Sequence, residues 1–168
     1  MIKLNLGSGD KIIKGYFNVD LYSEKPWTII DDITTLEKTI ESLGLDHRKV
    51  DEIYSSHSLM CVPESRLLST LKLWRRLLKK GGELIIETTD LDKQIREYNK
   101  DHFANSEIVV RSLFGDGVRD GEGLKYQFNS YLLGTWLERA GFKHITVISQ
   151  PKHSKHKEEF NLTMRAVK

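Results

Sequence analysis

Short apolar segments alternate along the chain with longer segments in which apolar residues recur at helical spacing. Seven segments read as strands because they are apolar or alternate with a period of two, namely residues 2–6, 16–20, 27–30, 51–55, 83–88, 143–149 and 160–167. Helices are predicted for residues 34–43, for an amphipathic segment that begins at Pro63, for a segment that begins at Asp90, and for residues 129–140. This order is typical of an α/β domain built on a mainly parallel sheet, and the last two strands have the pattern of a hairpin.

Composition narrows the class of protein. At 168 residues, with 39% hydrophobic and 30% charged residues, the chain fits one domain, 1–168, with a substantial core. No long apolar run is present, and no basic segment precedes an apolar stretch at the N-terminus, so we expect neither a membrane span nor a secretory signal, and a cytoplasmic location. A single cysteine, Cys61, excludes an internal disulfide and a cysteine-based zinc cluster, and no metal site is predicted. The net charge of +2 does not favour a nucleic-acid surface, and we expect the basic run 152–157 to be a solvated loop.

The first twenty residues carry the clearest chemical signal. The first strand ends in Gly7 and Gly9, and the second ends in the carboxylate of Asp20. Glycines at a strand tip let the main chain approach a ligand closely, and a carboxylate there can accept hydrogen bonds from both hydroxyls of a ribose. The alternative interpretations are a glycine turn without a ligand and an aspartate that caps a turn.

The spacing of these residues bears on the cofactor class. Gly7 and Asp20 are thirteen positions apart, whereas a dinucleotide fingerprint places its acid about twenty residues beyond the glycines. The first crossover helix must therefore be very short. That argues against an NAD or FAD site, which needs a full helix N-terminus facing a pyrophosphate.

Several motifs in their order along the chain resemble the class I S-adenosylmethionine-dependent methyltransferases, in particular the small predicted methyltransferase-domain proteins. They are Leu4-Asn-Leu-Gly-Ser-Gly9, Gly15-Tyr-Phe-Asn-Val-Asp20, Val50-Asp-Glu-Ile-Tyr-Ser-Ser-His57, Trp74-Arg-Arg-Leu-Leu-Lys-Lys-Gly-Gly82 and Trp136-Leu-Glu-Arg-Ala-Gly-Phe142. The resemblance implies a Rossmann-like three-layer sandwich with a seven-stranded, mainly parallel sheet, an antiparallel C-terminal strand and a shortened first crossover helix. It also implies S-adenosylmethionine as the cofactor.

The resemblance assigns cofactor-binding roles to nine residues: Asn5, Gly7, Ser8, Gly9, Asp20, Leu21, Asp32, Ile33 and Ser56. In this scheme free backbone N–H groups of the glycine loop bind the methionine carboxylate, and Asp20 binds the ribose. Leu21 packs on the adenine, with Asp32 at its amino group and Ile33 beside the ring. Asp31 and Asp32 are equally compatible with capping the helix at 34–43.

His57 is the catalytic candidate, because it ends the fourth strand beside the expected methyl position and a histidine can accept a proton near neutral pH. The alternative is a backbone-bonded histidine that shapes the pocket. Asp90 is expected to cap a helix. Residues 101–128 form an aromatic and glycine-rich insert that is expected to cover the site. Within it, Arg111, Arg119 and Tyr126 are substrate candidates; the alternative is solvent-facing arginines and a core tyrosine.

The implied reaction is direct displacement of a methyl group from a sulfonium by an acceptor, which depends chiefly on alignment of the reacting atoms. We expect a small-molecule or saccharide acceptor, methylated at oxygen. Relatives often carry His-x-Leu-Glu-His where this chain has His57-Ser-Leu-Met-Cys61. This departure motivates an alternative, a non-catalytic cofactor-binding or partner subunit. A third hypothesis is an RNA methyltransferase that uses the basic run 152–157.

Overall fold

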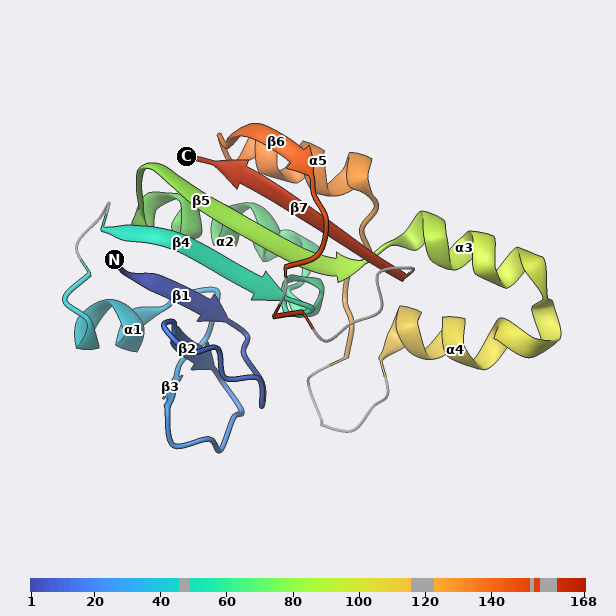
Figure 1. Ribbon diagram of the computed structural model, residues 1–168, viewed down its shortest axis with the longest axis horizontal. Helices are drawn as coiled ribbons and strands as arrows, with labels where there is room; N and C mark the ends of the chain where they lie inside the picture. The colour runs from blue at the N-terminus through green and yellow to red at the C-terminus, as the bar shows by residue number, and fades with distance from the viewer. Residues whose placement is uncertain (46–48, 116–122, 152, 155–159) are drawn as a thin grey trace.

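The computed structural model describes the chain except residues 46–48, 116–122, 152 and 155–159 and the side chains of residues 102–105. Its centre is one seven-stranded sheet with the order β3-β2-β1-β4-β5-β7-β6 (Figure 1). The strands are β1 (Lys3–Leu6), β2 (Phe17–Asp20), β3 (Thr28–Ile30), β4 (Val50–Ser56), β5 (Leu78–Thr89), β6 (Lys143–Val147) and β7 (Asn161–Val167). Strands β1 to β5 pair in parallel, whereas β7 is antiparallel to both β5 and β6. The predicted seven-stranded sheet with an antiparallel C-terminal strand is therefore confirmed.

The helices are α1 (Glu37–Ser42), α2 (Glu64–Leu77), α3 (Leu91–Lys100), α4 (His102–Phe114) and α5 (Ser130–Arg139), with a 3-10 turn η1 (Leu59–Cys61) after β4. The long predicted helix after Pro63 is α2, and it buries Leu67, Leu71 and Trp74 against the sheet. Strand β5 is longer than predicted, since it begins at Leu78, directly after that helix. Helix α4 lies in the segment read only as an insert, and α3 and α4 extend together beyond the sheet (Figure 1).

Within the part of the chain that the structure describes, helices cover one face of the sheet and not the other. Crossovers between parallel strands are right-handed, so connections that run β1 to β2 to β3 cross one face and those that run β3 to β4 to β5 cross the other. Helices α1 and α2 lie in the connections from β3 to β4 and from β4 to β5. The connections from β1 to β2 and from β2 to β3, residues 7–16 and 21–27, contain no helix. The expected three layers are thus reduced to a sheet and one helical layer, and the first crossover is a series of turns rather than a shortened helix.

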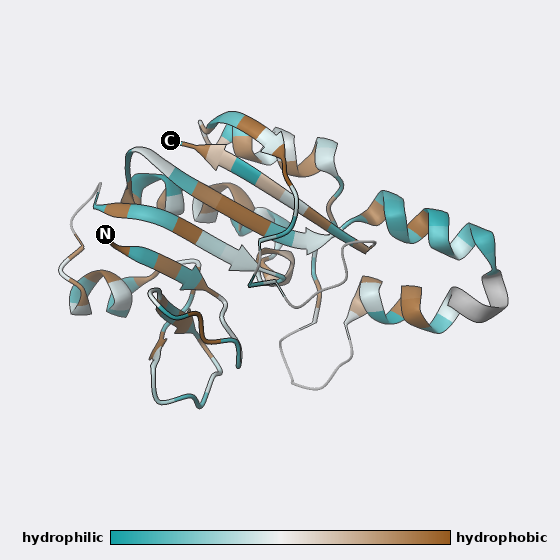
Figure 2. Ribbon diagram, in the orientation of Figure 1, coloured by the Kyte–Doolittle hydropathy of each residue, from teal (hydrophilic) through white to brown (hydrophobic). Residues whose placement is uncertain are grey.

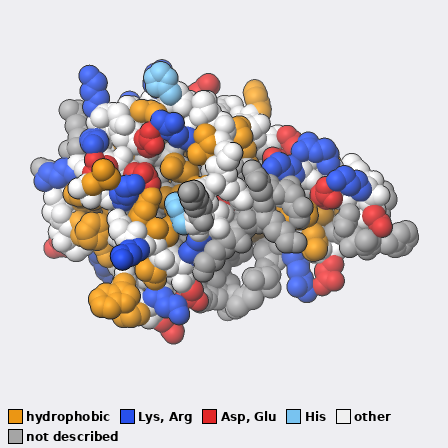
Figure 3. All heavy atoms as spheres, in the orientation of Figure 1, with side chains coloured by type: hydrophobic (Ala, Val, Ile, Leu, Met, Phe, Trp, Pro, Cys, Tyr) orange, Lys and Arg blue, Asp and Glu red, His pale blue; other side chains and the backbone are white. Residues whose placement is uncertain are grey.

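Polar and apolar residues alternate in β1 and β7, whereas the middle of β5 is continuously apolar (Figure 2). Leu4, Ile53 and Leu84 are paired neighbours on the helix-covered face and are fully buried. The next residue of β1 and of β4, Asn5 and Tyr54, points to the opposite face. Figure 3, a view of that face, shows acidic and basic side chains interspersed with apolar ones. A sheet covered by helices on both faces would have nearly continuous apolar strands instead.

The polar face is held together around the buried carboxylate of Glu87, which is 1% exposed. Its Oε1 accepts hydrogen bonds from Gln150 Nε2 at 2.9 Å, from Asn161 Nδ2 at 3.1 Å and from the Ser154 hydroxyl, and its Oε2 accepts one from the Tyr54 hydroxyl. Burial, and then the hydrogen bond to Glu87, raise the pKa of the Tyr54 hydroxyl. The segment that follows β6 is thereby fastened across the polar face, where it takes the place of a helix (Figure 1).

His153 lies in this segment and is half-buried, which differs from the solvated loop expected for the basic run; Lys152 and Lys155–Lys157 lie outside the described residues. Its ring meets the Tyr54 ring edge-on, with centroids 4.5 Å apart, and lies 6.1 Å from the Tyr16 ring. Burial first, and then the nearby charge of Lys11, lower the pKa of His153. The neutral imidazole is therefore the form that this face accommodates.

Gly7 is required by a close approach between β1 and the turn after β4. It has φ +69°, and a Cβ added to it would lie 2.1 Å from Ser58 Cβ. Ser58 is fixed there because its hydroxyl donates to the Leu6 carbonyl at 2.9 Å and is 2.6 Å from the Ser55 hydroxyl. The glycine of the first motif is thus needed for packing, whatever ligand the loop binds.

Gly7→Ala should destabilise the protein by about 2–4 kcal/mol, the sum of a left-handed alanine and an overpacked contact. Gly9→Ala is the matched control, because Gly9 also has positive φ (+50°) but its added Cβ meets nothing within 4 Å. It should cost only the backbone part, about 1–2 kcal/mol. Urea unfolding measures both free energies. Equal losses would contradict the role assigned to Ser58, and Ser58→Gly should restore part of the stability of Gly7→Ala.

The stability of the protein should fall as the pH decreases through about 6.5, in part because of His153. Its pKa is lowered in the folded state, so below about 6.5 the unfolded chain takes up a proton that the folded protein excludes. The nearby charges are those of Lys11, Lys3, Glu87 and Glu52. His153→Phe keeps an aromatic ring against Tyr54 but cannot be protonated. Urea unfolding at pH 7.5 and 5.5 should show a smaller loss for this variant; an unchanged loss would contradict the assignment.

Candidate functional site

The glycine loop and Asp20 meet at the C-terminal edge of the parallel strands. Gly7 N and Ser8 N both donate to the Val19 carbonyl, at 2.8 and 3.1 Å, and Gly9 N donates to Asp20 Oδ2 at 2.8 Å. The expectation that these N–H groups are free to bind a methionine carboxylate is therefore wrong for these three residues. Without a crossover helix, the loop folds directly onto the end of β2 and uses its own donors there. Open space remains beside Gly9.

Asp20 is held in one orientation by three backbone donors. Besides Gly9 N on Oδ2, its Oδ1 accepts from Tyr22 N at 2.8 Å and from Ser23 N at 2.9 Å. A carboxylate has about four lone-pair sites, so capacity remains for a hydroxyl donor from a ligand. A half-buried, rigidly placed carboxylate beside an open glycine fits the ribose of S-adenosylmethionine.

Asn5 holds the loop rather than facing open space. It is 2% exposed, and its Nδ2 donates to Asn18 Oδ1 at 2.8 Å and to the Lys11 carbonyl at 3.0 Å. Both hydrogens of that amide are thus used inside the protein. Ser8 is 6% exposed, and its hydroxyl donates to the Gly9 carbonyl at 3.4 Å. Cofactor contacts by Asn5 and Ser8 stay predictions.

The two acids after β3 both serve the local chain. Asp31 accepts from Asp32 N at 2.9 Å and from Thr39 N, within α1, at 2.7 Å. Asp32 Oδ1 accepts from the amide of Thr34 at 2.8 Å and from its hydroxyl at 2.6 Å, and Oδ2 lies 3.7 Å from Arg66. Asp31 therefore satisfies an amide in the first turn of α1, whereas Asp32 bonds to Thr34 before the helix, and the N-cap of α1 is Leu36 rather than either acid. A contact between Asp32 and adenine stays a prediction.

An apolar surface flanks Asp20. Leu21 is 44% exposed and Ile30, which pairs with Asp20 in the adjacent strand, is 42% exposed. Ile33, half-buried, accepts a hydrogen bond on its carbonyl from Trp74 Nε1 at 2.8 Å. Ile30 was missed by the sequence analysis, although its position as the last residue of a strand beside the carboxylate could have indicated it. These side chains suit a flat apolar ring such as adenine.

His57 follows β4 at the same edge of the sheet. It has φ +55°, a backbone conformation that is uncommon for residues other than glycine, and its N–H donates to the Glu87 carbonyl at 2.8 Å. Ser56, half-buried, pairs with Glu87 in the sheet. Left-handed residues of this kind cluster at functional sites, where the surrounding structure maintains the strain. The catalytic role of His57 and the cofactor contact of Ser56 stay predictions.

The substrate candidates are not brought together. Arg111 is exposed on α4 and pairs with Glu107 at 2.7 Å. The Tyr126 hydroxyl accepts from Trp136 Nε1 at 3.3 Å, and its ring lies 5.0 Å from that of Phe128, which is fully buried. Arg119 lies outside the described residues. Asp90 caps α3 as predicted, accepting from the amides of Asp92 and Lys93.

Two further findings concern the described residues as a set. Within them, no three or more His, Cys, Asp and Glu side chains are grouped as a metal ion would require. In the same part of the chain no helix is both long and apolar enough to span a membrane.

Comparison with known proteins agrees with this geometry. The methyltransferase domain family matches residues 19–86. A search of curated proteins gave no significant match. Solved structures with a similar fold include a SAM-dependent methyltransferase from Methanosarcina mazei, with 16% identity, coverage of 99% of this chain and 91% of that one, and a TM-score of 0.65.

Two other similar structures carry more specific descriptions. One is a Burkholderia thailandensis 1,6-didemethyltoxoflavin-N1-methyltransferase with its substrate and S-adenosylhomocysteine bound, with 15% identity, 99% and 70% coverage, and a TM-score of 0.62. The other is a complex of a putative methyltransferase with the Trm112 methyltransferase activator of Haloferax volcanii, with 13% identity, 99% and 81% coverage, and a TM-score of 0.58. The strand order, the family match over residues 19–86 and the fold shared with these structures are consistent with the class I S-adenosylmethionine-dependent methyltransferases that the sequence motifs resemble.

Proposed function

We propose that this protein transfers a methyl group from S-adenosylmethionine to an oxygen atom of a small-molecule or saccharide acceptor in the cytoplasm. The observation that carries the proposal is Asp20, a carboxylate fixed by three backbone amides beside the open side of Gly9. This arrangement lies on the fold and at the sheet edge where the superfamily binds its cofactor. The single cysteine, Cys61, suits a reducing compartment.

The chain supplies binding and orientation for this reaction. Asp20 binds the ribose hydroxyls, Leu21, Ile30 and Ile33 flank the adenine, and Asp32 lies next to its amino group. When bound, S-adenosylmethionine supplies a methyl group on a positively charged sulfur. The remaining task of the protein is to hold the acceptor oxygen close to that carbon and in line with it, which lowers the barrier by several kcal/mol, up to about 7–11.

His57 is proposed to accept the proton that the acceptor oxygen loses. It follows β4, next in the sheet to the strand that carries the glycine loop, and its backbone is fixed by the Glu87 carbonyl. The strained φ holds the imidazole in a position that an unstrained residue would not take.

A second candidate function is a cofactor-binding subunit that needs a partner for activity. The observation that favours it is that residues 57–61, where this chain departs from its relatives, have a structural role. Ser58 packs on Gly7 and bonds to the Leu6 carbonyl, and η1 follows directly. The Haloferax volcanii relative is described in a complex with an activator. An RNA acceptor ranks third, because the net charge is only +2 and His153 of the basic run 152–157 packs against Tyr54.

Isothermal titration with S-adenosylmethionine and S-adenosylhomocysteine tests the cofactor site. Asp20→Ala should weaken binding at least about 30-fold, because hydrogen bonds to a charged group each contribute roughly 1.5–3 kcal/mol. Asp10→Ala is the matched control: it removes the same charge from the same loop, but Asp10 is exposed and contacts only Lys25, at 4.0 Å. Its affinity should stay within about twofold of the wild type.

Asp20→Ala also removes the partner of Gly9 N, so a second measurement separates ribose binding from loop structure. S-adenosylhomocysteine without its 2′- and 3′-hydroxyls should bind the wild type weakly, and Asp20→Ala should not distinguish it from the normal ligand. Absence of binding to the wild type would overturn the proposed function. If the wild type and Asp20→Ala prefer S-adenosylhomocysteine over the analogue without hydroxyls by the same factor, the role of Asp20 is overturned.

A further inference from the structure

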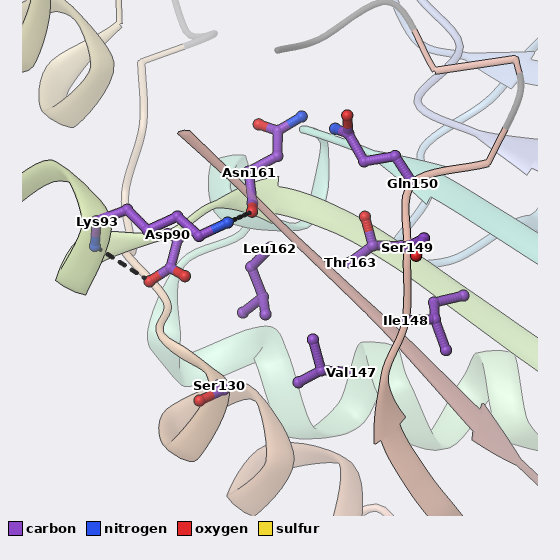
Figure 4. A pocket seen from close by; sticks show the side chains of 10 residues that line it. All are labelled: Asp90, Lys93, Ser130, Val147, Ile148, Ser149, Gln150, Asn161, Leu162 and Thr163. Carbon is purple, nitrogen blue, oxygen red and sulfur yellow. Dashed lines mark hydrogen bonds between the residues drawn. The ribbon is translucent and has the colours of Figure 1, made fainter. Parts of the chain in front are cut away.

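A pocket that none of the predicted site residues lines lies farther along the same edge of the sheet, with a volume of about 360 Å³ (Figure 4). Asp90 follows β5, Val147 ends β6, Asn161 begins β7 and Ser130 begins α5, and all four line it. Because β7 is antiparallel to β5, the start of β7 lies at the edge where β4 and β5 end. The pocket therefore lies at the same edge of the sheet as the end of β4, beside which the methyl group of the cofactor is expected, with β5 between β4 and β7.

We infer that this pocket binds the methyl acceptor, and that the acceptor is a neutral small molecule with several hydroxyl groups. The inference rests on the proposed function and adds to it the position and chemistry of the acceptor.

Two buried polar groups in the pocket have hydrogen-bonding capacity left over. Asp90 is 9% exposed, and its Oδ1 accepts from the amides of Asp92 and Lys93 at 3.1 and 3.4 Å, while no described residue donates to its Oδ2. Thr163 is 2% exposed, and its hydroxyl is buried without a partner within the described structure. Buried polar groups are almost always hydrogen-bonded, since an unmade bond costs about 1–3 kcal/mol. A ligand that supplies these bonds explains why the groups are retained.

The charges of the pocket favour a neutral ligand. Lys93 Nζ lines the same pocket and donates to the Asn161 carbonyl at 2.7 Å (Figure 4). Among the described residues, the lining contains one carboxylate and one ammonium, whose charges balance. Hydroxyl groups both donate and accept, so they suit the carboxylate oxygen of Asp90 and the hydroxyl of Thr163 together.

The size and walls of the pocket indicate a compact ligand. Its volume is near the lower end of the usual range for ligand pockets, about 300–1,000 Å³. Val147 and Leu162 supply apolar surface for the carbon skeleton of such a molecule. The polar wall is rigid, because the Gln150 and Asn161 amides both donate to Glu87. A monosaccharide or another cyclic polyol has these properties.

The test is an amide NMR titration of the protein saturated with S-adenosylhomocysteine, using D-glucose, D-mannose and myo-inositol as probes and choline as a cationic comparison. At least one polyol should shift the amides of Lys93, Ser130, Ser149 and Thr163. Asp90→Asn keeps the helix cap, because asparagine caps as well as aspartate, but places an NH2 group where Oδ2 stood. It should raise the dissociation constant of that polyol about tenfold or more, and Thr163→Val should do likewise.

Asp92→Asn is the control, since it removes the same charge two residues farther along the chain. The Asp92 carboxylate accepts a hydrogen bond from Asn129 at 3.2 Å and does not line the pocket. The substitution should leave polyol binding unchanged. The inference is overturned if no polyol shifts these amides, if choline alone does, or if Asp90→Asn behaves like Asp92→Asn. Titration of S-adenosylmethionine on the same samples separates the two proposals: retained cofactor binding without polyol binding overturns the acceptor pocket alone, whereas loss of cofactor binding overturns the proposed function.

Discussion

The polar face of this sheet depends on the hydrogen bonds made by one buried carboxylate, that of Glu87. A carboxylate at the centre of a sheet is costly unless its oxygens are hydrogen-bonded. Here Tyr54, Gln150, Ser154 and Asn161 supply the donors. Because the donors come from β4, from the segment after β6 and from β7, satisfying one side chain fixes three parts of the chain together. The network therefore substitutes for the packing that a helical layer would provide.

The missing helical layer also explains the form of the proposed cofactor site. Without a helix after β1, the glycine loop uses the carbonyl of Val19 and the carboxylate of Asp20 to satisfy its own amides. The site thus relies on a side chain and on apolar surface more than on a helix N-terminus. Such a site suits a cofactor without phosphates, which is the class that the short spacing between Gly7 and Asp20 had favoured.

The hydrogen bonds of Glu87 also connect the proposed cofactor site to the proposed acceptor pocket. Glu87 receives the amide of His57 on its carbonyl and the side chains of Gln150 and Asn161 on its carboxylate. One residue of β5 therefore orients the catalytic candidate and a wall of the pocket beside Asp90. Rigid placement of this kind is what alignment of a methyl group with an acceptor oxygen requires.

The sequence by itself determined the succession of strands and helices along the chain and the α/β class, because periodicity and turn residues act locally, and it singled out Gly7, Gly9 and Asp20 as the proposed cofactor site. The cap at Asp90 was likewise readable from its position before a helix. The alternation of polar and apolar residues in β1 and β7 was present in the sequence and was the overlooked signal of a sheet with one helical face. Only the tertiary structure decided which groups use up their hydrogen bonds: Asn5 and the loop amides bond within the protein, whereas Asp90 Oδ2 and the Thr163 hydroxyl receive no partner from the described residues. That distinction depends on contacts between residues far apart in the chain, which no local pattern specifies.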